Sequence, residues 1–121
     1  MTVAHIVLIK FRPEVAQEHK DNVIREIQKM KEMNSIKGRS LVVGASITVP
    51  MERSKGFEIA LVSFHENKTE LEKYRNSEEH HRITSTSIYP FQDESIRFDF
   101  EVAPEDDFLL NILSLQDNKK Q

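Results

Sequence analysis

The chain has 121 residues, of which 38% are hydrophobic and 31% charged, with a formal net charge of −3 and no cysteine. This length fits one domain with a single core. The lack of basic excess argues against nucleic acid as a partner, and the lack of cysteine excludes disulfides and thiolate chemistry. No apolar run is long enough to cross a bilayer and no secretory signal is evident, so we expect a cytoplasmic protein without a membrane partner.

The first predicted element is a strand over Val3–Arg12, which is followed by a long helix. Both faces of this strand are mostly apolar, which predicts that it is covered on both sides. Pro13 stands where the first residue of a helix would lie, and apolar residues recur after it at helical spacing. We therefore predict an amphipathic helix from Pro13 to about Asn34.

Two more strands are predicted in the middle of the chain, over Ser40–Val49 and Gly56–Phe64, because both segments are rich in β-branched and aromatic residues. Asn67 is a typical N-cap and starts a short helix that ends near Arg75. Ser77 is a second typical N-cap, and it starts a helix that runs to about Ile88.

The last predicted strand is Glu94–Val102, in which apolar and polar residues alternate. Its polar residues Arg97, Asp99 and Glu101 are expected to form an exposed or inter-strand charge ladder. Residues 103–121 are predicted to be a C-terminal extension with a short helix over Pro104–Leu115, whose apolar side chains must dock on the domain or on a partner.

The resulting order, β-α-β-β-α-β, is typical of a ferredoxin-like α+β sandwich in which helices cover one face of an antiparallel sheet. The other face has no cover within the chain although the first strand is apolar on both sides. A second copy with the same surface is the simplest partner for that face. We therefore predict a homodimer that forms through the open sheet face.

Several segments resemble the stress-responsive dimeric A/B-barrel (Dabb) family over residues 1–102. They are VAHIVLIKFRP at 3–13, Lys55-Gly-Phe57, Tyr74 followed by His80, and RFDFE at 97–101. The resemblance implies a dimeric α+β barrel, in which two four-stranded sheets face each other, with a pocket between each sheet and its helices.

The Dabb family includes heat-stable plant stress proteins and olivetolic acid cyclase, which closes a polyketide chain by an aldol reaction. The resemblance implies that His80 is a catalytic base, that Tyr74 holds the substrate carbonyl and that His5 lies in the pocket. The cyclase has a further pocket histidine in its third strand, where this chain has Glu58-Ile59. That imidazole is therefore missing at the matching position.

Tyr74 and His80 are six residues apart, which on one continuous helix would separate their directions by about 120°. They can face each other only if the helix breaks between them, and Ser77 offers such a break. His80 would then lie in a first helical turn, where the positive end of the helix dipole lowers the pKa of its imidazole. The alternative is that Ser77 merely starts a helix and His80 is a buried, hydrogen-bonded residue.

No metal and no cofactor are predicted. His80 and His81 are adjacent and point about 100° apart on a helix, unlike a helical ligand pair at a spacing of three or four residues. His19 and His65 are interpreted as surface residues. The predicted apolar walls of the pocket, which complete a substrate-binding set with His5, are Phe57, Ile59 and Phe91.

Two functions of different classes remain open at this stage. The first is a cyclase-like enzyme without a cofactor, in which His80 removes a proton next to a carbonyl group and Tyr74 stabilises the enolate. The second is a non-enzymatic stress-response protein or ligand carrier. Both bind a small, partly apolar molecule in the barrel pocket.

Overall fold

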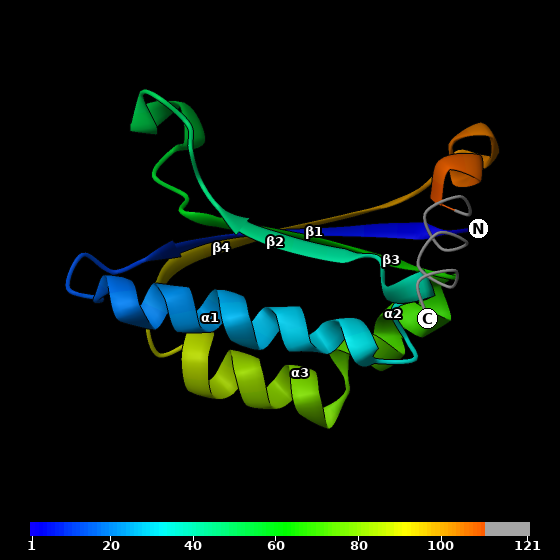
Figure 1. Cartoon of the computed structure of the whole chain (residues 1–121), viewed down its shortest axis with the longest axis horizontal. Helices are drawn as coiled ribbons and strands as arrows, with labels where there is room; N and C mark the ends of the chain where they lie inside the picture. Colours follow the sequence, from blue (N-terminus) through cyan, green and yellow to red (C-terminus); the bar gives the residue numbers. More distant parts are fainter. Residues whose placement is uncertain (111–121) are drawn as a thin grey trace.

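The fold is built on one antiparallel sheet, seen edge-on in Figure 1, in a computed structural model that describes residues 1–110. The strand order is β2-β3-β1-β4. The strands are β1 (Val3–Phe11), β2 (Leu41–Ala45), β3 (Ile59–His65) and β4 (Gln92–Glu101). Strand β1 lies between β3 and β4 and pairs antiparallel with both.

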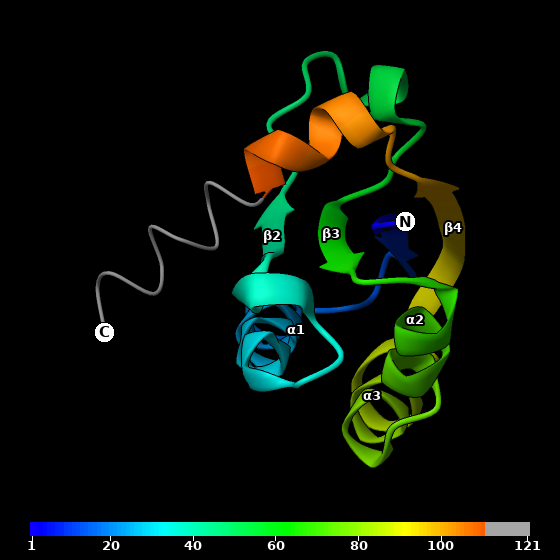
Figure 2. The same ribbon diagram turned by 90° about the vertical axis from the view of Figure 1, so that its right-hand side faces the viewer.

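The α-helices lie on one face of this sheet (Figures 1 and 2). They are α1 (Gln17–Lys29), α2 (Lys68–Arg75) and α3 (Glu78–Ile83), and α3 continues into a π-helical turn, Thr84–Ile88. Short 3-10 turns span Met30–Glu32, Lys37–Arg39 and Met51–Ser54. This architecture confirms the predicted ferredoxin-like α+β fold.

Several element boundaries differ from the predicted ones. Helix α1 begins at Gln17 because Ala16 still has an extended backbone, so Pro13 lies in a turn and does not start the helix. Strand β2 ends at Ala45 and β3 begins only at Ile59. The segment between these two strands leaves the sheet as a projecting loop (Figure 1), because its residues have no neighbouring strand with which to pair.

The core lies between the sheet and the helices. Alternate residues of β1 and β3 point toward the helical layer, and the buried face of α1 packs on them. The main cluster includes Val3, Ile9, Phe11, Val23, Ile27, Leu41, Ile59, Leu61, Leu71, Tyr74 and Ile83. This arrangement matches the predicted apolar spacing of both elements.

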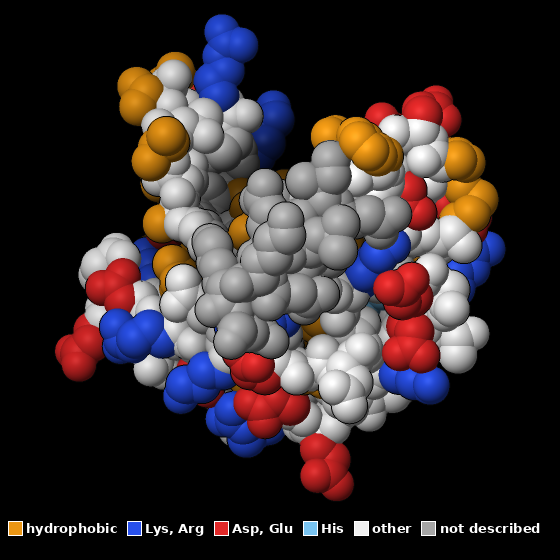
Figure 3. All heavy atoms as spheres, turned by 45° about the vertical axis from the view of Figure 1, so that its right-hand side comes forward, with side chains coloured by type: hydrophobic (Ala, Val, Ile, Leu, Met, Phe, Trp, Pro, Cys, Tyr) orange, Lys and Arg blue, Asp and Glu red, His pale blue; other side chains and the backbone are white. Residues whose placement is uncertain are grey.

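The opposite face of the sheet is apolar, and residues 1–110 cover it only at one end, where Leu110 packs on Ala4. The exposed apolar side chains on this face are 42% to 62% accessible; they belong to Val42, Ile96, Phe98 and Phe100. We call these four residues the open face. Two projections rise on this side, the β2–β3 loop and the segment after β4, and Figure 3 shows apolar side chains gathered on both.

Residues 104–110 are helical and dock on the start of β1. Leu110 is buried in a small cluster with Ala4 and Val102. Beside them, the carboxylate of Asp107 accepts a hydrogen bond of 2.6 Å from the Thr2 hydroxyl. The rest of the predicted C-terminal helix, with Ile112, Leu113 and Leu115, lies outside the described residues. Within residues 1–110, no helix combines the length and hydropathy that crossing a bilayer requires.

Candidate functional site

The site is organised by the break between α2 and α3. Helix α2 ends at Arg75, and Ser77 caps α3 by accepting a hydrogen bond of 3.1 Å from the backbone N–H of His80. The Ser77 hydroxyl also donates to the carbonyl of Tyr74 at 2.7 Å. One serine therefore binds the backbone of both residues, and it allows their rings to meet at a centroid distance of 4.9 Å. The predicted helix break is confirmed.

Replacing Ser77 with alanine should lower the free energy of unfolding by about 0.5–2 kcal/mol, because the cap of α3 is lost. Urea unfolding followed by circular dichroism would measure this. Asn67→Ala is the matched control, since Asn67 caps α2 in the same way, accepting from Glu70 N–H at 2.9 Å. Only Ser77→Ala should also shift the NMR signals of the His80 ring. Equal shifts from both variants would contradict the role of Ser77 in positioning that ring.

Tyr74 lies in the middle of three imidazoles. Its ring centroid is 4.9 Å from that of His65, 4.9 Å from that of His80 and 5.7 Å from that of His5. The interpretation of His65 as a surface residue is wrong, because its exposed fraction is 0%. His65 has the same parity in β3 as the buried Leu61, so its side chain points into the helical layer.

Hydrogen bonds fix the tautomers of two of these histidines. His65 Nδ1 donates to the carbonyl of Ser35 at 2.6 Å, so its Nε2 accepts from the Ser63 hydroxyl at 2.8 Å. His5 Nδ1 donates to the Asp99 carboxylate at 2.5 Å, which leaves Nε2 as an acceptor when the ring is neutral. Asp99 thus orients a buried imidazole, a more specific role than the predicted charge ladder.

A cavity of about 250 Å³ opens beside this cluster, between the sheet and the helices. The apolar part of its lining consists of Val7, Ile9, Ile27, Met30, Leu61, Ile83, Ile88 and Tyr89. The polar part consists of His5, Tyr74, Arg75, Asn76, His80, His81, Thr84, Gln92, Ser95 and Arg97. We call this cavity the pocket. It is elongated along β1 and β4, because its lining extends from His5 to Ile9 on one strand and from Gln92 to Arg97 on the other.

The structure brings His5, Tyr74 and His80 together in the pocket but places the three predicted wall residues elsewhere. The Phe57 ring lies under the Lys10 ammonium, 4.9 Å from it, and the Phe91 ring lies 3.9 Å from that of His19. Ile59 belongs to the main core cluster and pairs across the sheet with Ile9 of β1. The apolar walls come instead from β1, β3, α1 with the turn after it, and α3 with the turn after it, and sequence alone does not place these elements around one cavity.

Two polar atoms of the pocket residues are buried without a hydrogen-bond partner in the described part of the chain: the Tyr74 hydroxyl and Gln92 Oε1. An unpaired buried polar atom costs about 1–3 kcal/mol. Such atoms are uncommon in stable proteins unless a ligand or water satisfies them. The Tyr74 hydroxyl is therefore a buried donor whose hydrogen bond no described group of the protein accepts.

The surroundings of His80 and Tyr74 keep both side chains uncharged at neutral pH. Burial, together with the nearby charges of His5, Arg75 and Arg97, lowers the pKa of His80 to about 4. The direction agrees with the prediction, although burial is the main cause and not the helix dipole. Burial also raises the pKa of Tyr74, so its phenol keeps its proton at neutral pH.

Acid should destabilise the fold through these histidines. Burial lowers the pKa values of His5, His65 and His80 in the folded chain below the ordinary 6.5. Below pH 6.5 the unfolded chain therefore binds more protons than the folded one, and stability falls as the pH falls toward about 4, the folded pKa of His80. We expect a lower urea midpoint at pH 5.0 than at pH 7.5 at one protein concentration. Equal midpoints would contradict this.

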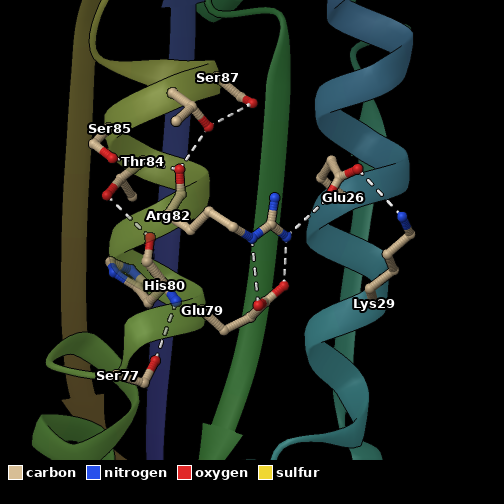
Figure 4. A network of polar contacts seen from close by, with 10 residues as sticks. Glu26, Lys29, Ser77, Glu79, His80, Arg82, Thr84, Ser85 and Ser87 are labelled. Atoms are coloured by element: carbon tan, nitrogen blue, oxygen red, sulfur yellow. Dashed lines mark hydrogen bonds and ion pairs between the residues drawn. The ribbon is translucent and has the colours of Figure 1, made fainter.

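Figure 4 shows that the His80 ring and the Arg82 side chain point to different sides of α3. Arg82 lies on the outer side and binds Glu79 at 2.6 Å and Glu26 of α1 at 3.0 Å. The Arg82–Glu26 ion pair connects the two helices that cover the pocket. Among residues 1–110, no group of three or more His, Asp or Glu side chains is arranged to hold a metal ion.

An antiparallel four-stranded sheet with helices on one face and a pocket between the layers defines a ferredoxin-like α+β domain. Within this class, the family model of the stress responsive A/B barrel domain (Dabb) matches residues 3–102. The chain belongs to the Dabb family, as the resemblance of its strands indicated. A comparison with curated proteins finds no significant match.

Solved structures support the fold. A dimeric ferredoxin-like protein from Thermobifida fusca superposes with a TM-score of 0.73 at 17% identity, covering 84% of this chain and 92% of the other. The hydroxynitrile lyase of Passiflora edulis superposes with a TM-score of 0.73 at 16% identity, covering 85% of this chain and 94% of the lyase. An Arabidopsis thaliana protein superposes with a TM-score of 0.70 at 17% identity, covering 84% of this chain and 95% of the other.

Proposed function

We propose that the pocket is an acid–base site that acts on a small, partly apolar carbonyl compound without a cofactor. The observation that supports this proposal is the buried Tyr74 hydroxyl, which has no partner and lies beside the neutral imidazole of His80. A hydrogen-bond donor and a base that face one cavity are the two groups that enolate formation requires.

In the proposed step, His80 removes a proton from the carbon next to the carbonyl group. The C–H bond breaks and its electron pair forms the carbon–carbon double bond of the enolate. The π pair of the carbonyl group moves onto its oxygen, to which the Tyr74 hydroxyl donates a hydrogen bond. In a cyclisation, the enolate carbon then attacks a second carbonyl carbon of the same molecule, and the oxygen of that carbonyl group takes the proton back from His80. His5, oriented by Asp99, contributes a further polar group to the pocket wall.

A ligand carrier or non-enzymatic stress-response protein is the second candidate. The complete burial of Tyr74, whose exposed fraction is 0%, favours it, because a substrate would have to displace neighbouring side chains to reach the hydroxyl. Such a protein would bind the same partly apolar molecules but would not transfer a proton.

We also propose that the chain forms a homodimer through the open face. Its exposed phenylalanines, Phe98 and Phe100, are 62% and 45% accessible. A contiguous apolar surface of this kind on a soluble domain marks an interaction site. The similar Thermobifida fusca protein is described as dimeric.

Hydrogen–deuterium exchange tests the reaction without knowledge of the natural substrate. The protein in D₂O should accelerate exchange of the α-protons of 4-phenyl-2-butanone, a neutral ketone with an apolar tail, as followed by proton NMR. Binding of the ketone without faster exchange would contradict the proposed enzymatic function and support the ligand carrier.

A further inference from the structure

We propose that the pocket selects a carbonyl compound that also carries a carboxylate, which Arg75 and Arg97 bind at the pocket mouth. This inference rests on the proposed function and adds the class of substrate. The described residues that line the pocket include these two arginines together with His80 and His81, and they include no aspartate or glutamate.

Arg97 reaches the pocket from the sheet. It has the same parity in β4 as Ser95 and Asp99, which face the helical layer, and its side chain is 45% exposed. Its Nε contacts Asp99 Oδ2 at 3.3 Å, and this contact fixes one edge of the guanidinium. The terminal nitrogens carry four further N–H donors, a geometry that suits a planar carboxylate.

Arg75 reaches the same cavity from the helical layer, at the last residue of α2. Its side chain is 33% exposed, and its Nη1 binds Glu72 at 2.9 Å. Neither Glu72 nor Asp99 belongs to the pocket lining. The two carboxylates therefore lie outside the lining, and the charged groups that line the cavity are cationic.

The electrostatics at His80 support this placement independently. The charges of Arg75 on α2, Arg97 on β4, His5 on β1 and His81 on α3 all lower the pKa of His80. A bound carboxylate would offset part of this positive field and raise that pKa. The anion would thus make His80 a stronger base when the substrate is in place.

Isothermal titration calorimetry at pH 7.5 tests the selection with 4-phenylbutanoate and its neutral analogue 4-phenylbutanamide. The acid should bind at least about tenfold more tightly than the amide, which corresponds to about 1.4 kcal/mol. Arg97→Gln and Arg75→Gln should each reduce this preference severalfold, whereas Arg97→Lys should retain part of it. Arg25→Gln, an exposed change on α1 outside the pocket lining, is the control and should leave it unchanged.

A second measurement does not depend on the arginine variants. The pKa of His80, followed by NMR on the unsubstituted protein, should rise on addition of 4-phenylbutanoate and stay constant with the amide. Equal affinity for acid and amide, or an unchanged pKa with bound acid, would overturn the inference. Selective acid binding without α-proton exchange would instead overturn the proposed reaction and leave the carboxylate site standing.

Discussion

Replacing His80 with glutamine should slow α-proton exchange of 4-phenyl-2-butanone by about 10²–10⁴-fold, the usual contribution of a general base. Glutamine keeps a polar side chain of similar reach but cannot accept the proton. The Ser77 cap binds the backbone of residue 80, so α3 should form as before. Proton NMR in D₂O measures the rate, and calorimetry with the same ketone checks that binding survives.

Two further variants test whether slower exchange in His80→Gln reflects the loss of the base. His19→Gln is the control, because the His19 ring binds the carbonyl of Ser87 and lies outside the pocket lining. Tyr74→Phe should also slow exchange, yet it should leave the urea midpoint unchanged or raise it, because it removes a buried hydroxyl that has no partner. An undiminished rate in His80→Gln would refute the assignment of the base.

Phe98→Glu should convert the dimer to a monomer. Phe98 is 62% exposed on the open face, so the substitution is tolerated in a single chain. A carboxylate buried between two apolar sheets would lose its hydration without gaining a partner, at a cost of several kcal/mol. Light scattering coupled to size-exclusion chromatography should give twice the chain mass of 14.1 kDa for the unsubstituted protein and the single mass for the variant.

Tyr89→Glu is the matched control for this experiment. Tyr89 is 59% exposed, close to the value for Phe98, but it follows the π-helical turn on the helical side of the sheet. This variant should remain dimeric. A monomeric unsubstituted protein, or a Phe98→Glu variant that stays dimeric, would exclude the open face as the dimer interface.

Local signals predicted much of the fold and the centre of the site. Ser77 and Asn67 act as the N-caps that their residue types indicated, and this placed the helix break between Tyr74 and His80 correctly. The alternation of Val3–Phe11 predicted a strand with two apolar faces. These features depend on a few consecutive residues, so they can be read without tertiary information.

Features that depend on pairing between distant segments could not be predicted in the same way. Asp99 meets His5 because β1 and β4 pair in one particular register, which sequence alone does not give. His65 is buried because β3 continues one residue further than predicted and keeps its parity. His65 supplies a third imidazole next to Tyr74. The position that matches the third-strand histidine of the cyclase holds Glu58-Ile59 in this chain, and Glu58 binds Lys20 at 2.5 Å.

Strand β4 contributes to the pocket with one face and to the open face with the other. Arg97 and Asp99 lie toward the helices, while Ile96, Phe98 and Phe100 lie on the opposite side. Inserting or deleting one residue in this strand would exchange the two sets, placing charge in the apolar surface and aromatic rings in the pocket. A change in the length of β4 by one residue would therefore remove both properties in a single step.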